Sequence, residues 1–165
     1  MKREAIATKP VLPTIGLATC NADWPNHHDD ASSAGVPADH FVERDGTVFA
    51  GTHLILDLWG AKNLDNLKVV ERALRESVDR CNATLLHIHL HHFTPNGGIS
   101  GVAVLAESHI SVHTWPERDF AAFDIFMCGE AKPEEAICVL KRAFCPKVMN
   151  IRENLRGVVD HAQVQ

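Results

Sequence analysis

The stretch GVAVLAESHISVHTWPE, residues 101–117, decides the fold of this chain. One short apolar run predicts a strand over Gly101–Glu107, and a second run predicts another strand over Ile110–Trp115. Pro116 ends the second strand, because proline cannot donate a backbone hydrogen bond to a sheet. A Glu-Ser peptide bond therefore lies where the first of these strands ends.

On both sides of this stretch, short apolar runs predict four more strands, and apolar residues at helical spacing predict one helix in each half of the chain. The element order becomes strand-helix-strand-strand, then strand-strand-helix-strand, a βαββ/ββαβ pseudo-repeat. Two helices on one face of a mostly antiparallel sheet is the economical packing, so the sequence predicts an α+β two-layer sandwich. The other sheet face would need a cover, and a second copy of the chain is a candidate. The four further strands are expected over Thr52–Trp59, Thr84–Phe93, Phe120–Met127 and Lys147–Ile151.

The two helices are predicted from apolar side chains at helical spacing. Asn63 or Asp65 could cap the start of the first helix. The second helix is expected over Pro133–Phe144, with Pro133 in its first turn, where a missing N–H costs nothing. The apolar face of the first helix comprises Leu64, Leu67, Val70, Leu74 and Val78.

The 165 residues suit one folded domain, which we expect to span 46–165. Residues 1–45 hold four prolines and no persistent periodicity, and are predicted to form a flexible extension. A net charge of −5 without a run of Lys or Arg argues against nucleic-acid binding. No apolar stretch is long enough to span a membrane. Prolines interrupt the apolar run that follows Met1-Lys2-Arg3, which argues against a signal peptide. The five cysteines form an odd set without a CxxC pair, which fits a reducing compartment better than a disulfide framework, so a cytoplasmic protein is expected.

Ser108 is the residue with the most informative chemistry. A serine hydroxyl is a weak nucleophile until a base or a strained geometry helps it, and the nearest electrophile is the carbonyl of Glu107. Attack on that carbonyl would exchange an amide for an ester, and β-elimination would then cut the chain. Such a reaction needs a base and donors for the oxyanion. His113 is a plausible base, and Ser100 and Cys128 are plausible helpers if the sheet brings them near.

Two other interpretations remain open on spacing alone. Ser108 could be an ordinary surface residue of a strand. His87, His89 and His91 alternate along one predicted strand and therefore share a face, with His92 on the other face. Three imidazoles at this spacing could bind zinc, nickel or iron, so a metal-binding protein is a competing hypothesis.

Three segments resemble the short prokaryotic S-adenosylmethionine decarboxylase proenzymes. They are FTPNGGISG at 93–101, ESHISVHTWPE at 107–117 and FDIFMCGE at 123–130. The likeness extends from about residue 50 to about residue 155 and includes both predicted helices. The resemblance implies an α+β sandwich that forms a homo-oligomer with sites near the subunit interface. This oligomer would be a dimer of αβ units, each made of the two chains of one cleaved precursor, or a larger assembly.

The resemblance also implies cleavage before Ser108, into a β chain of residues 1–107 and an α chain of residues 108–165. Ser108 would become a covalent pyruvoyl group, which forms a Schiff base with the substrate amine and accepts its electrons as pyridoxal phosphate would. No metal is implied. The implied processing residues are Glu107, Ser108, Ser100 and the proton acceptor His113; Cys128 would be the proton donor, and Phe93 and Glu117 would bind the adenine and the ribose of the substrate.

The implied activity is decarboxylation of S-adenosylmethionine, whose product donates aminopropyl groups for spermidine and other polyamines. Relatives on the same fold can change substrate, so an arginine or ornithine decarboxylase is an alternative, as is an unprocessed, inactive partner subunit. Phe93 and Glu117 favour the nucleoside substrate. The N-terminal extension has no counterpart in the short family core.

Overall fold

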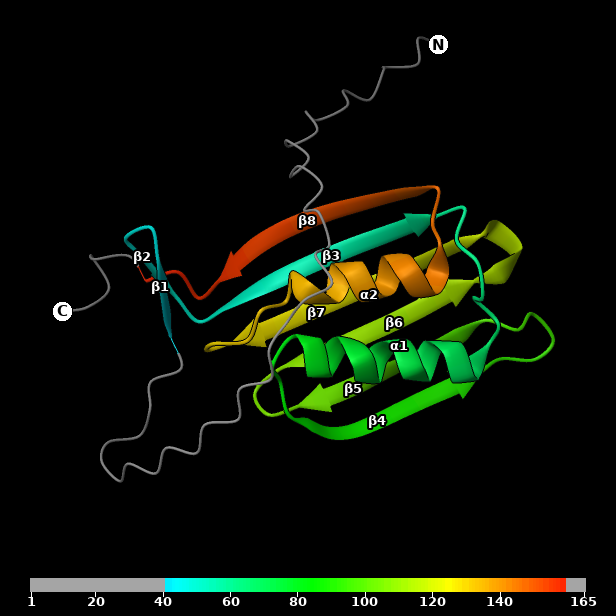
Figure 1. Cartoon of the computed structure of the whole chain (residues 1–165), viewed down its shortest axis with the longest axis horizontal. Helices are drawn as coiled ribbons and strands as arrows, with labels where there is room; N and C mark the ends of the chain where they lie inside the picture. Colours follow the sequence, from blue (N-terminus) through cyan, green and yellow to red (C-terminus); the bar gives the residue numbers. More distant parts are fainter. Residues whose placement is uncertain (1–40, 160–165) are drawn as a thin grey trace, which may run out of the picture.

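The computed structural model describes residues 41–159, which form one six-stranded sheet with two helices, preceded by a small hairpin (Figure 1). The order along the sheet is β4-β5-β6-β7-β3-β8, and every strand pairing within the described residues is antiparallel. The sheet strands are β3 (Gly51–Trp59), β4 (Leu85–His92), β5 (Ile99–Leu105), β6 (His109–Trp115), β7 (Phe120–Cys128) and β8 (Val148–Arg156). The helices are α1 (Leu67–Arg80) and α2 (Glu135–Phe144), and η1 (Pro116–Arg118) is a short 3-10 turn.

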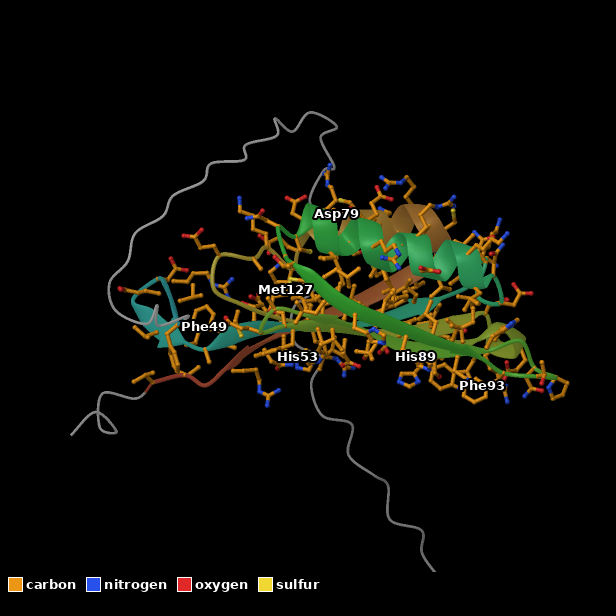
Figure 2. All side chains as sticks on the ribbon, turned by 90° about the horizontal axis from the view of Figure 1, so that it is seen from below. Phe49, His53, Asp79, His89, Phe93 and Met127 are labelled. Atoms are coloured by element: carbon orange, nitrogen blue, oxygen red, sulfur yellow. The ribbon has the colours of Figure 1, made fainter. Side chains whose placement is uncertain are left out.

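Both helices cover the same face of the sheet, as the edge-on view shows (Figure 2). Alternate residues of the central strands point toward them and are buried, including Leu56 on β3, Phe123 on β7 and Val112 on β6. The helices contribute Leu74 and Phe144, which are also fully buried. The predicted α+β two-layer sandwich is therefore confirmed, since a period-2 strand pattern and a 3.6-period helix pattern bury one face each.

Helix boundaries differ from the sequence prediction by a few residues. The α1 helix is capped by Asn66, whose side-chain oxygen accepts a hydrogen bond from the Val69 amide at 3.2 Å, so the prediction of Asn63 or Asp65 as the cap was wrong. Asn63 instead donates its side-chain amide to the Ala143 carbonyl near the end of α2. The second helix begins at Glu135 rather than at Pro133.

The last strand is longer than its apolar residues predicted. It was expected over Lys147–Ile151, but β8 continues to Arg156 because β3 offers a partner along its whole length. The second half of β8 is polar, so the apolar pattern did not predict that the strand continues there. Edge strands often carry such charged residues, which protect them from pairing with other chains.

A two-stranded hairpin precedes the sheet, formed by β1 (Val42–Arg44) and β2 (Thr47–Phe49). An ion pair between Arg44 and Glu153 at 2.5 Å ties it to β8, and Phe49 is buried. The hairpin lies next to the ends of β3 and β8 (Figure 1). It overlaps the end of the segment expected to be flexible; the remainder, 1–40, lies outside the described residues, so the domain boundary near residue 46 stays a prediction.

Within residues 41–159, no helix or strand covers the face of the sheet that is turned away from the helices. His53, His89 and Phe93 project from it (Figure 2). It also carries a row of aromatic rings: Trp59 lies 4.3 Å from Phe120, and Phe120 lies 5.3 Å from Trp115, between ring centroids. Contiguous exposed apolar side chains on a sheet indicate a surface that is covered in the assembled protein. We refer to this surface as the open face.

The burial pattern generates a stability prediction. Phe123→Ala removes a ring that is 1 % exposed and should lower the free energy of unfolding by about 3–5 kcal/mol, measured by urea denaturation. Phe93→Ala is the matched control, because Phe93 is 47 % exposed and should cost far less. Equal losses for the two variants would contradict the assigned core.

Candidate active site

Ser108 lies in the tight turn that joins β5 to β6. The Leu105 amide donates to the Ser108 carbonyl at 2.9 Å, which closes the turn. The Ser108 side chain is not free to rotate in solvent, because the residue is only 8 % exposed and the backbone amide of Cys128 donates to its Oγ at 3.2 Å. The hydroxyl predicted to react is therefore held between two strand ends.

Glu107, the residue before Ser108, has a left-handed backbone with φ of 63°. Non-glycine residues adopt this conformation at a modest energetic cost, mostly in turns. The conformation lets the chain reverse within the β5–β6 turn while Ser108 faces Cys128. We call Glu107, Ser108 and Cys128 the cleavage group.

Two effects keep the thiol of Cys128 in its protonated form. Burial raises the pKa of Cys128 above its ordinary value, and the negative charge of Glu107 raises it further. Both disfavour the thiolate, the first because it removes water and the second by repulsion between like charges. A thiol in this state is a proton donor at neutral pH rather than a nucleophile.

A second group of predicted residues lies at the other end of the strands. Ser100 on β5 and His113 on β6 are register partners, and Ser100 Oγ lies 2.9 Å from His113 Nδ1. Phe93 follows the end of β4, and its ring contacts that of His91 at 4.5 Å. Glu117 lies in η1, directly after β6. We call Phe93, Ser100, His113 and Glu117 the far-end group.

The structure does not bring the two groups together within one chain. His113 follows Ser108 by five residues along an extended strand, which corresponds to about 17 Å at the usual rise of a β-strand. Ser100 is separated from Ser108 by most of β5. All seven predicted residues lie on or beside the sheet, but as two clusters at opposite ends, and their individual roles stay predictions.

A polar network that the sequence did not reveal crosses the middle of the open face. His53 Nε2 lies 3.3 Å from one oxygen of Asp124, and Ser111 donates to the other oxygen at 3.2 Å. Arg156 lies 3.4 Å from His53 Nδ1. Because a guanidinium can only donate, Nδ1 accepts this bond and Nε2 carries the proton that points to Asp124. The four residues come from four strands, so only the strand order could have revealed the network.

The histidine-rich strand gains no support as a metal site. His87, His89 and His91 lie on β4, an edge strand, and all three are exposed. Within residues 41–159, no three His, Cys, Asp or Glu side chains are arranged to hold a metal ion. No helix in the described part of the chain is long and apolar enough to cross a membrane.

Comparison with known proteins identifies the family. Residues 52–157 match the family described as S-adenosylmethionine decarboxylase. This chain belongs to that family. The match covers both clusters and all six strands of the main sheet except the first residue of β3. The hairpin β1–β2 precedes the matched region.

Relatives of this decarboxylase family occur in bacteria and archaea. The S-adenosylmethionine decarboxylase proenzyme of Thermomicrobium roseum is 46% identical over 110 residues, covering 66% of this chain and 95% of that protein. The proenzyme of Methanococcus maripaludis strain S2 is 43% identical over 118 residues, covering 70% of this chain and 96% of that protein. The crystal structure of the adenosylmethionine decarboxylase from Aquifex aeolicus VF5 superposes with a TM-score of 0.62 at 31% identity, covering 71% of this chain and 98% of that chain.

The buried hydroxyl of Thr114 ties the end of β6, beside the far-end group, to neighbouring backbone groups. Thr114 Oγ1 donates to the Leu64 carbonyl at 2.7 Å and accepts from the Ile99 amide at 2.8 Å. Thr114→Val should lower the free energy of unfolding by about 2–3 kcal/mol in denaturant titrations, because it leaves two buried backbone groups without a partner. Thr114→Ser keeps the hydroxyl and should lose less. A Val variant as stable as the Ser variant would show that these hydrogen bonds contribute little.

Proposed function

We propose that this chain is a precursor that cuts itself between Glu107 and Ser108 and then decarboxylates S-adenosylmethionine. The observation that carries the proposal is the position of the Ser108 hydroxyl, 3.2 Å from the Cys128 amide in a chain of this decarboxylase family. Three atoms, Cβ, Cα and N of Ser108, separate this hydroxyl oxygen from the Glu107 carbonyl carbon, so attack would close a five-membered ring. The Cys128 N–H donates a hydrogen bond to the same oxygen. Curated relatives at more than 40% identity carry the name proenzyme, which supports self-processing.

The cleavage that we propose balances without any outside oxidant. Ser108 Oγ attacks the carbonyl carbon of Glu107, and the amide becomes an ester as the nitrogen leaves. A base removes the Cα proton of Ser108, and the Cβ–O bond breaks, so that the oxygen stays with Glu107 as a carboxylate. The dehydroalanine left at position 108 takes up water and releases ammonia, which leaves a pyruvoyl group.

After cleavage, the pyruvoyl group would supply an electron sink for decarboxylation. The protein's residues do the remaining work at that position. The turn between β5 and β6 holds residue 108 against the end of β7, beside Cys128. The protonated thiol of Cys128 then donates a proton to the substrate carbon that lost its carboxylate, consistent with the raised pKa of this thiol.

The base and the substrate-binding residues would come from a second copy of the chain. The far-end group is about a strand length from Ser108 in its own chain, so it cannot serve that serine. A twofold dimer that pairs the two open faces would place the far-end group of one copy beside the cleavage group of the other. It would also cover the exposed apolar residues of this surface, which include Trp59, Phe93, Val104, Trp115 and Val148.

In the assembled site, the far-end group has suitable chemistry for each proposed task. His113, held by Ser100, can accept the Cα proton during processing. Phe93 offers an exposed ring that can stack on adenine, and the carboxylate of Glu117 can accept hydrogen bonds from both ribose hydroxyls. The cationic sulfonium of the substrate suits a pocket lined by aromatic rings.

Intact-mass spectrometry with an activity assay tests the proposed function. The purified protein should separate into two chains divided before Ser108, the second lacking a free amine, and should release carbon dioxide from S-adenosylmethionine but not from arginine or ornithine. Ser108→Ala removes the nucleophile and should remain one chain without activity. A wild-type protein that stays uncut at 18.2 kDa, or a Ser108→Ala chain that is cut, would refute self-processing.

A further inference from the structure

The imidazole of His91 on β4 has no task in the proposed function, yet it contacts a ring that has one. The centroids of the His91 and Phe93 rings lie 4.5 Å apart, and their planes meet at 71°. Such a T-shaped contact is attractive, because the positive edge of one aromatic ring meets the negative face of the other. His91 therefore restricts the tilt of the Phe93 ring.

The backbone of Phe93 is already fixed, so its ring is the part whose position depends on a neighbour. The Phe93 amide donates to the Gly98 carbonyl at 2.8 Å, and the Phe93 carbonyl accepts from the Gly97 amide at 3.0 Å. The side chain, by contrast, is 47 % exposed, and within residues 41–159 its one ring contact is with His91. An exposed side chain loses rotational freedom when it packs on a ligand, and a ring that is held in advance loses less.

The strand register places His91 in one row with two members of the far-end group. His91 is the partner of Ser100 across β4 and β5, and Ser100 is the partner of His113 across β5 and β6. Directly opposed residues of antiparallel strands project from the same face, so these three side chains lie side by side on the open face. Alternation along β4 agrees, since His89, two residues earlier, projects from the open face (Figure 2).

We propose that His91 is a positioning residue of the far-end group, which holds the Phe93 ring at the angle needed to stack on a planar nucleobase. This inference rests on the proposed function, in which Phe93 binds the adenine of the substrate. His91 acts through that ring and not on the reacting atoms. His87, on the same strand and face, is also an exposed histidine, but it makes no ring contact within the described residues.

Steady-state kinetics of the processed enzyme distinguish this role from a merely structural one. His91→Ala removes the ring contact and should raise KM for S-adenosylmethionine about three- to tenfold, with kcat within about twofold of wild type, because a stacking contact serves the bound substrate and the transition state alike. His91→Phe restores an aromatic ring and should return KM to near the wild-type value. His87→Ala is the matched control and should leave KM unchanged. An unchanged KM in His91→Ala, an equal rise in His87→Ala, or no rescue by His91→Phe would overturn the role of His91.

A double-mutant cycle tests whether His91 acts through Phe93. The probe is adenosine, which carries the base and the ribose without the reacting group, and its dissociation constant is measured by isothermal titration calorimetry. His91→Ala should weaken adenosine binding about three- to tenfold in the wild-type background and should change nothing in the Phe93→Ala background. Equal losses in both backgrounds, or adenosine that does not bind the wild type, would overturn the inference. If the wild type were uncut and inactive, the proposed function would fail, and these affinities would still decide the role of His91.

Discussion

The alternation of side chains along the six antiparallel strands is the constraint on which the rest of the structure depends. One set of alternate residues packs against α1 and α2 and forms the core, so the other set must lie on the open face. The same rule that buries Phe123 therefore presents Asp124 and Cys128 to the opposite side. The candidate site residues are therefore confined to that second set and to the turns at the strand ends.

Strand length then separates the two clusters of candidate site residues. β6 begins next to the turn that carries Ser108, and His113 and Trp115 lie near its other end. A strand cannot fold back on itself, so one chain alone presents two half-sites at a distance of a strand length. A twofold axis parallel to the open face and perpendicular to the strands would resolve this separation twice, once for each copy, and the dimer would cover the aromatic row formed by Trp59, Phe120 and Trp115.

Much of the fold could be predicted because apolar residues recur every second position in the strands and at helical spacing in the helices. The order of elements and the layer on which the helices lie were right, and boundaries moved by only a few residues, as at Asn66. β8 was predicted too short because its second half is polar, and its pairing with β3 is set by tertiary contact rather than by pattern. The seven candidate residues could be named from the motif, but their grouping into one site ignored the strand geometry, which separates Ser108 and His113 by about 17 Å. The network around His53 was missed because its members are distant in sequence and meet only through the strand order.

The central claim is that each active site is assembled from two copies of the chain, and mixed dimers test it most directly. Chains with Cys128→Ala and chains with Glu117→Gln, each inactive or weak alone, are co-expressed with different tags and the mixture is assayed for decarboxylation. A site shared between copies predicts recovery to about a quarter of wild-type activity, because half of the random dimers would contain one intact site of two. Co-expressed Cys128→Ala and Ser108→Ala chains, altered at the same end, should recover none. Activity of the first mixture no higher than that of its separate variants would contradict the claim.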